Sequence, residues 1–327
     1  MPIITVNNLS KKFKTLTAVD AISFEVNEGE VFGFLGPNGA GKTTTINILC
    51  TLLSPTGGSA EIAGYDCATQ SDKVRSSLGL LFQDTTLDAG LTAYENLKFH
   101  AYLYNLDPRL TEQRIDEILG VVELRNRKHD LIKNFSGGMK RRLEIGRALL
   151  HYPRVLFLDE PTLGLDPQTR NTIWDFINNL RSKEKITVFM TTHYMEEAEN
   201  CDRIAIMDHG KIIALDTPTK LKAVVHGDVI HLATSDNKKA LKEIQDSFHL
   251  SAREENGGLV LEVEKGEEFI PGLLHALSVT TRSVSLTKPT LNDVFLKLTG
   301  RVIRDEGLMD SKETTREFVR SHRRAQR

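Results

Sequence analysis

The sequence predicts an α/β fold in which a nucleotide-binding core is followed by a smaller α+β domain. A glycine-rich loop stands between an apolar run at residues 31–35, typical of a buried strand, and a helical segment at 43–53. Further apolar runs end in polar residues, as strands do where open α/β sheets bind ligands; these runs lie at 78–82, 155–160 and 186–193. From about residue 226 the order becomes strand, helix, strand, strand, helix, strand. We therefore expect two domains.

Length and composition limit the possible functions. A chain of 327 residues is long enough for two domains, and its formal net charge of −2 argues against general attraction to nucleic acid or other polyanions. Three scattered cysteines, Cys50, Cys67 and Cys201, indicate a reducing compartment without a disulfide framework. We see no signal peptide, and no apolar run approaches the roughly 18 residues of a membrane span. Any role at a membrane is therefore expected to be that of a peripheral subunit.

Residues 36–43 fit the phosphate-loop pattern, in which two glycines flank four residues and Lys-Thr follows. Glycines bring backbone N–H groups close to phosphate oxygens, where a side chain would collide. Lys42 supplies a charge for the β- and γ-phosphates, and the Thr43 hydroxyl can ligate Mg²⁺. A chance match is the alternative, but the flanking strand and helix favour a nucleoside triphosphate site in a P-loop NTPase core. The predicted binding residues are Gly36, Pro37, Asn38, Gly39, Ala40, Gly41, Lys42, Thr43 and Thr44.

Two other predicted strands end in side chains suited to phosphate chemistry. The run at 155–160 ends in adjacent carboxylates, Asp159 and Glu160. Because neighbouring strand residues point in different directions, one can hold Mg²⁺ while the other faces an attacking water. His193 ends the run at 186–193, and we interpret the other histidines as surface or packing residues. Gln83 follows another strand, where a lone Gln is usually just a hydrogen-bonded end residue.

Two further segments have both an ordinary and a functional interpretation. Ser136 is a plausible N-cap for a basic helix at 140–150, and the Ser-Gly-Gly sequence would leave backbone N–H groups open to an anion. Ser-Gly-Gly is also common in turns. Phe13 lies in a lysine-rich part of the alternating, antiparallel strands predicted within residues 3–34. It is either a half-exposed strand aromatic or a stacking platform for a purine.

The domain boundaries follow from these patterns. We predict a nucleotide-binding domain at 1–225, with an inserted helical subdomain at about 84–151, in which Leu97, Ala101 and Leu103 share an apolar face. A ferredoxin-like accessory domain occupies 226–300; it has no catalytic cluster, which favours a regulatory or assembly role. Its last segment, at 288–300, reads as a capped amphipathic helix that could dock this unit.

The charged segment at 301–327 is expected to be a disordered, solvated tail. Weak attraction to an anionic membrane surface is the alternative.

The order of these motifs resembles the nucleotide-binding subunit of ABC transporters over about residues 3–225. The resemblance depends on the phosphate loop, Gln83, the segments 135–139 and 155–160, Gly164-Leu165-Asp166, and His193. The appended domain, with the segment at 288–300, looks like that of the drug-resistance (daunorubicin-type) branch of ABC exporters.

The resemblance implies a role for each residue at the ATP site. Phe13 would stack on adenine, and Gln83 would reach Mg²⁺ and the attacking water while sensing a membrane partner. Asp159, with Thr43, would hold Mg²⁺. Glu160 would be the general base, and His193 would contact the γ-phosphate.

The resemblance also implies that the site is shared. Ser136, Gly137, Gly138 and Met139 would complete the ATP site of the opposite subunit, so that two subunits pair head-to-tail around two ATP molecules. Asp166 would lie at that seam. Met139 replaces the usual Gln of the signature, and its thioether is at most a weak acceptor.

We therefore predict an ATP hydrolase, using ATP and Mg²⁺, that powers export of a drug, lipid or other amphiphile. Its partners would be a separate ABC membrane permease and a second ATP-binding subunit, expected to form a homodimer, at the cytoplasmic face of the cell membrane. One alternative is an import ATPase, although the appended domain of importers is often a β-barrel. Another is a soluble ABC ATPase acting on nucleic acid or ribosomes. The single cassette without a long coiled coil argues against it, so no nucleic-acid partner is expected.

Overall fold

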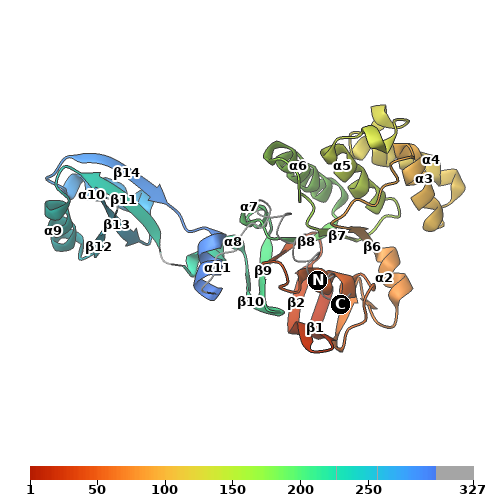
Figure 1. Cartoon of the computed structure of the whole chain (residues 1–327), viewed down its shortest axis with the longest axis horizontal. Helices are drawn as coiled ribbons and strands as arrows, with labels where there is room; N and C mark the ends of the chain where they lie inside the picture. The colour runs from red at the N-terminus through yellow and green to blue at the C-terminus, as the bar shows by residue number, and fades with distance from the viewer. Residues whose placement is uncertain (226, 256, 300–327) are drawn as a thin grey trace, which may run out of the picture.

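The computed structural model describes residues 1–299 except 226 and 256, so the predicted tail at 301–327 lies outside the described residues. Figure 1 shows a larger part, built from the N-terminal two thirds of the chain, and a smaller part with its own sheet and helices set apart from it. Helices α8 (Pro218–Ala223) and α11 (Leu291–Thr299) lie between these parts. No helix in the described ranges combines the length and apolar character needed to span a membrane.

An antiparallel sheet forms one layer of the larger part, as the alternating N-terminal sequence predicts. Its order is β2-β1-β4-β5. The bounds are β1 (Pro2–Phe13), β2 (Leu16–Asn27), β4 (Gly57–Ile62) and β5 (Tyr65–Asp66). Ile4 and Val6 of β1 are paired with Val26 and Phe24 of β2, and all four are buried. One face of this layer therefore packs into the core.

The central six-stranded sheet has the order β10-β9-β3-β8-β7-β6 and is parallel except for β10. Its strands are β3 (Val31–Leu35), β6 (Leu78–Leu81), β7 (Val155–Asp159), β8 (Thr187–Thr192), β9 (Arg203–Asp208) and β10 (Lys211–Asp216). The predicted buried strands are thus confirmed. Because β3, β8 and β7 are neighbours, the phosphate loop, His193 and the carboxylate pair meet at one edge of the sheet.

Side chains of β3 divide between two cores according to strand alternation. Val31 and Leu35 join the core shared with the helical subdomain, whereas Phe32 and Phe34 join the core under the antiparallel sheet. In the second core, the ring centroids of Phe34 and Phe189 lie 4.9 Å apart. Aromatic contacts of this kind add to the stability from burial.

Five helices surround these sheets outside the helical subdomain. They are α1 (Lys42–Leu49), α2 (Ser71–Ser77), α6 (Pro167–Glu184), α7 (Met195–Ala198) and α8 (Pro218–Ala223). The helix after the phosphate loop ends at Leu49, earlier than the predicted residue 53. Thr51 adopts a positive φ of 61°, which is incompatible with continued right-handed helix.

The predicted inserted block is helical, with α3 (Ala93–Leu103), α4 (Pro108–Val121) and α5 (Gly137–Ala148), and with short 3₁₀ turns at Arg125–Arg127 and Ile132–Asn134. Leu97 and Ala101 are buried as expected, but Leu103 is 60% exposed. The expectation of a shared face for Leu103 was wrong. Two residues beyond Ala101, at about 100° per residue, its side chain points to the opposite side of the helix.

The small domain has its own core and a four-stranded antiparallel sheet in the order β12-β13-β11-β14. Its elements are β11 (Asp228–Thr234), α9 (Asn237–Phe248), β12 (Ala252–Glu255), β13 (Gly258–Val263), α10 (Gly266–Ala276) and β14 (Thr281–Thr287). The first strand lies between the third and the fourth, which is the predicted ferredoxin-like arrangement. Strand β12 lies slightly later than the expected residues 250–253.

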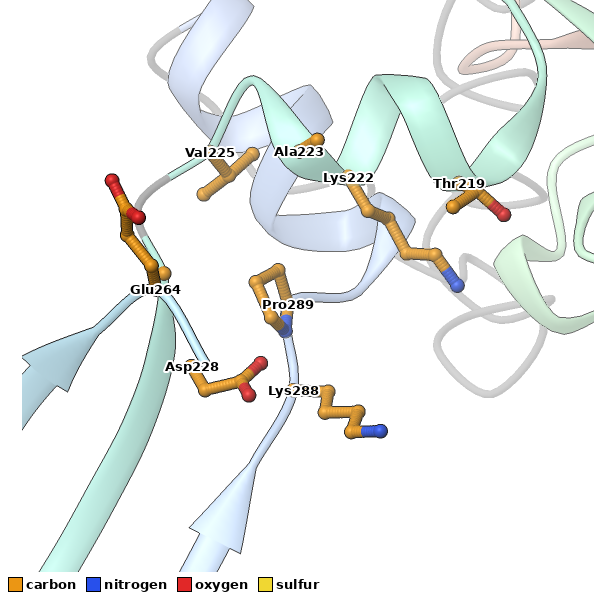
Figure 2. A pocket seen from close by; sticks show the side chains of 9 residues that line it. Thr219, Lys222, Ala223, Val225, Asp228, Glu264, Lys288 and Pro289 are labelled. Atoms are coloured by element: carbon orange, nitrogen blue, oxygen red, sulfur yellow. The ribbon is translucent and has the colours of Figure 1, made fainter. Parts of the chain in front are cut away.

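The last described helix, α11 (Leu291–Thr299), returns to the larger part. Thr290 caps it: its hydroxyl oxygen accepts from Asp293 N, and its own N–H donates to Asp293 Oδ2 at 2.8 Å. Leu291 and Phe295 are buried in the core that also holds Leu221 of α8. Figure 2 shows the cleft beside helices α8 and α11, where the chain leaves for the small domain and returns from it. Helix α11 therefore docks as predicted, on the nucleotide-binding part.

Candidate functional site

The phosphate loop connects β3 to α1 and requires glycine for two separate reasons. Gly39 and Gly41 have φ values of 80° and 106°, which side-chain-bearing residues rarely adopt. A Cβ at Gly41 would lie 2.4 Å from the carbonyl oxygen of Ala18, and one at Gly36 would lie 2.4 Å from that of Met207. The loop backbone thus packs closely against β2 and the end of β9 at its glycines.

Lys42 is the first residue of α1 and is buried. Its Nζ donates to the carbonyl oxygens of Gly36 at 2.7 Å and Pro37 at 3.1 Å, so the ammonium lies within the curve of the loop. Burial lowers the pKa of Lys42, while the nearby carboxylates Glu160 and Asp159 act in the opposite direction. A positive charge is therefore held where a phosphate chain would lie against the loop.

An open pocket of about 490 Å³ lies over the loop, a volume suited to a nucleotide. Ten of the residues that line it were predicted from the sequence to belong to the site: Phe13, Asn38, Gly39, Ala40, Gly41, Lys42, Thr43, Thr44, Gln83 and Glu160. Phe13 is 43% exposed at the end of β1, with the Lys11 ammonium 5.2 Å from its ring centroid. The structure thus places an accessible aromatic face, the phosphate loop and Gln83 around one space.

Four lining residues were not predicted: Leu16, Thr17, Ala18 and His209. The first three begin β2, and His209 belongs to the turn between β9 and β10. Gly210 of that turn donates its N–H to the carbonyl oxygen of Ala40 at 2.9 Å. Only the packing of the turn against the loop brings His209 to the pocket, so no local sequence signal marks it.

Asp159 is the last residue of β7 and accepts a hydrogen bond from the buried hydroxyl of Thr191. The Thr43 hydroxyl lies 3.4 Å from the same carboxylate oxygen. Burial raises the pKa of Asp159; the hydroxyl of Thr191 opposes that shift, and the charge of Glu160 adds to it. The two oxygen donors expected to hold Mg²⁺ therefore lie side by side. This set suits Mg²⁺, which keeps several waters and takes few protein ligands.

Glu160 follows β7 with a positive φ of 48°, a strained conformation for a residue with a side chain, at a cost of about 1–3 kcal/mol. Its N–H donates to the carbonyl and hydroxyl oxygens of Thr191 at 3.2 and 3.1 Å. The carboxylate Oε1 lies 3.2 Å from Nδ1 of His193. Burial acts to raise the pKa of Glu160, but His193 and Lys42 outweigh it and the net shift is downward. Glu160 and His193, each predicted separately for this site, are therefore in contact.

The Ser-Gly-Gly residues lie elsewhere. Ser136 caps α5 as predicted, because its Oγ accepts from Met139 N at 3.3 Å. Asp166 caps α6 by accepting from Thr169 N at 3.0 Å, and a Cβ on Gly138 would collide with the Thr169 side chain. These two helix starts therefore adjoin each other. Among the described residues that line the pocket over the phosphate loop, none comes from 136–139 or is Asp166.

Comparisons with known proteins agree with this geometry. Residues 19–163 match the "ABC transporter" family, and residues 217–299 match the family "ATP-binding protein DrrA1-3-like, C-terminal domain". The linearmycin resistance ATP-binding protein LnrL of Bacillus subtilis is 39% identical over 307 residues, covering 91% of this chain and 98% of that protein. The daunorubicin resistance ATP-binding protein DrrA3 of Streptomyces coeruleorubidus is 37% identical over 303 residues, covering 91% and 96%.

A solved structure shows the same fold and a paired state. It is the dimeric, post-hydrolysis state of the ATP-binding cassette MJ0796 bound to ADP and Pi, with a TM-score of 0.58 and 28% identity. The match covers 65% of this chain and 98% of that one.

The fold and the adjacent carboxylates, Asp159 and Glu160, define a P-loop ATPase. The chain belongs to the ATP-binding subunits of ABC transporters, in the drug-resistance exporter branch. It is an ATP-binding and ATP-hydrolysing subunit that powers export through a separate permease. ABC subunits of this kind dimerise and work with membrane permease partners.

Proposed function

We propose that ATP lies along the phosphate loop, with its phosphates against residues 36–44 and its adenine on Phe13. The proposal is supported by the pocket itself, because the glycine backbone, Lys42 and the exposed Phe13 ring all line it. Helix α1 directs its positive end toward the same space.

Thr43, Asp159 and Gln83 would hold Mg²⁺ in this site. The ion would neutralise charge on the phosphates, which is its usual contribution to phosphoryl transfer. The contact between the Thr43 hydroxyl and Asp159, together with the place of Gln83 on the pocket lining, supports this assignment.

Glu160 would accept a proton from the attacking water, and His193 would orient the γ-phosphate and the Glu160 carboxylate. A general base must be unprotonated at working pH, and the lowered pKa of Glu160 keeps it so. The hydrogen-bond distance between Glu160 and His193 fixes the direction of the carboxylate. Contacts of this kind reduce the reorganisation needed during the reaction.

A second copy of the chain would complete each site with Ser136, Gly137, Gly138 and Met139, and Asp166 would lie at the seam. The first turn of α5 has unpaired N–H groups at its start, as every helix does, and Ser136 and Gly137 are exposed. Because these residues do not line the pocket of their own chain, they are available to a partner's nucleotide.

The membrane partner would be an ABC permease, and the subunit would work at the cytoplasmic face of the membrane. We propose an amphiphilic compound as the exported substrate, because similar proteins are named for linearmycin resistance, daunorubicin resistance and Nod factor export. The small domain would act in regulation or assembly.

The observation that carries the proposal is the contact of Glu160 and His193 beside the phosphate loop. Its test is Glu160→Gln, which removes the base but keeps the shape. We expect ATP binding to persist, hydrolysis to fall by about 10²–10⁴-fold, and an ATP-dependent dimer to accumulate in light scattering. Undiminished turnover would remove Glu160 from the role of base, and a chain that stays monomeric with ATP and Mg²⁺ would contradict the two-copy site.

The exported substrate is tested in vesicles that contain this chain and its co-purified permease. We expect an amphiphilic drug to stimulate ATP hydrolysis and to be moved across the vesicle membrane. Movement of the drug toward the side of the membrane that carries this chain would instead support import.

A further inference from the structure

Arg141 has an unusual set of contacts for a residue of a basic helix. It lies on α5, about one turn after the helix start at Gly137, and is only 7% exposed. Its Nε donates to the carbonyl oxygen of Pro161 at 2.5 Å, and its Nη1 donates to that of Phe82 at 2.8 Å. Its Nη2 donates to the carbonyl oxygen of Glu160 at 2.9 Å. A planar guanidinium has donors in the fixed geometry that such a set of contacts needs.

These carbonyls belong to the two loops that carry the proposed catalytic side chains. Phe82 directly precedes Gln83, and Pro161 directly follows Glu160. Arg141 itself does not line the pocket over the phosphate loop among the described residues. Its effect on the reaction must therefore pass through the positions of other groups.

Glu144, one helical turn further along α5, completes the arrangement. Its Oε2 lies 3.3 Å from Nη1 of Arg141, and its Oε1 accepts from the backbone N–H of Thr86 at 2.8 Å. The buried charge of Arg141 is thus balanced by a buried carboxylate. The two side chains together fasten α5 to the loop after β6 and to the turn after β7.

The hydrogen bond from Arg141 to the Glu160 carbonyl is especially important because the Glu160 backbone has a positive φ of 48°. Such a conformation persists only where the surroundings hold it. Thr191 holds the N–H of Glu160, and Arg141 holds its carbonyl oxygen. These two contacts set the direction in which the Glu160 side chain leaves the backbone.

We propose that Arg141 is a positioning residue that makes the orientation of the catalytic carboxylate of its own chain depend on the seating of helix α5. The same helix begins with residues 136–139, which in the proposed function reach the ATP bound by the partner. Arg141 then links the occupancy of the partner's site to hydrolysis at its own site. This second half rests on the proposed function.

The test is Arg141→Lys in the full-length chain, with Arg114→Lys as the matched control. Arg114 lies on α4, is also 7% exposed, and also donates to backbone carbonyls, those of Leu149 and Leu150. We expect kcat to fall by about 100-fold in Arg141→Lys, because small misplacements of a catalytic group have effects of this size. KM for ATP should stay within about twofold, because Arg141 does not contact the nucleotide. In Arg114→Lys, kcat per folded molecule should stay within about twofold of wild type.

A merely structural role would lower Tm in both variants and reduce activity equally. The proposal is overturned if Arg141→Lys keeps its kcat, or loses no more kcat than Arg114→Lys at a matched loss of Tm. Should Arg141→Lys fail to fold, Glu144→Gln tests the same fastening, and an unchanged kcat there also overturns the proposal. Failure of the two-copy site appears separately, as a Glu160→Gln chain that does not dimerise with ATP although its Arg141 is intact.

Discussion

Two open clefts of similar size lie in this chain, and both contain lysines, but only one has the features of a phosphate site. The cleft over the phosphate loop measures about 490 Å³, and the one at the junction with the small domain about 570 Å³. In the first, Lys42 is buried in a curve of glycine backbone beside two carboxylates. In the second, Lys222 and Lys288 are paired with Glu199 and Glu267, at 2.6 and 2.8 Å.

The difference shows that cleft volume alone does not identify a binding site. The junction lysines are neutralised by carboxylates, and Asp228, which also lines that cleft (Figure 2), accepts from the backbone N–H of Gly266 at 2.8 Å. The charged groups of the junction cleft therefore pair with other segments of the same chain. In the nucleotide cleft, charge is instead concentrated at buried positions, where electrostatic interactions are stronger than in water.

The largest expected effect separates the two clefts through their lysines. Lys42→Met should reduce ATP hydrolysis by about 10³-fold, because the phosphate loop loses the positive charge that would attract the phosphates of ATP. Steady-state hydrolysis by the permease complex measures this loss. Lys222→Met is the matched control in the other cleft, and an equal loss in that variant would show that the two clefts do not differ in this respect.

A smaller effect is expected at Phe13, the exposed aromatic residue that lines the nucleotide cleft. Phe13→Leu should raise KM for ATP by about 10-fold, because base stacking on an aromatic ring contributes roughly 1–3 kcal/mol. Phe13→Tyr keeps the ring and should stay close to wild type. A Leu variant with the KM of the wild type would show that Phe13 is only a half-exposed strand residue.

The buried carboxylate of the nucleotide cleft should lower stability when no ligand is bound. Because burial raises the folded-state pKa of Asp159, its stabilising protonated form is lost as pH rises from the ordinary Asp value through the folded-state value. Asp159→Asn removes this penalty and should raise Tm by roughly 1–3 °C at neutral pH. Thermal denaturation at several pH values measures the gain, which should shrink as the pH is lowered. A lower Tm for the variant at every pH would contradict the raised pKa.

The smallest effect is expected at the junction. A double variant, Lys222→Met with Lys288→Met, removes one partly exposed and one exposed ion pair, which each contribute about 0–1 kcal/mol. ATP hydrolysis by the isolated chain should stay within about twofold of wild type. A large loss of hydrolysis would show that the junction communicates with the nucleotide cleft.

Most of the nucleotide site follows from local sequence. The phosphate loop, Asp159, Glu160 and His193 come directly after buried strands, and their meeting follows from the parallel order of those strands. The ferredoxin-like order also follows from local sequence, because each of its strands and helices has a clear pattern of its own. Which chain uses the Ser-Gly-Gly residues is a question of assembly, so the two-copy site stays a prediction.

Residues whose role depends on packing between distant segments were not predicted. Arg141 reads as one more charge on a basic helix, and only the folded chain shows it buried against the turn after β7. His209 reaches the nucleotide cleft because a distant turn packs on the phosphate loop. Leu103 is apolar, but its angular position on α3 turns it away from the face that Leu97 and Ala101 bury.

The return of α11 to the larger part makes the small domain an insertion rather than an appendage. Because α8 and α11 share one core, the points where the chain departs and re-enters lie next to each other. The whole of β11 to β14 could thus be excised and the gap closed with a few glycines, leaving the ATPase intact. Whatever such a shortened transporter then lost would measure what the inserted module contributes.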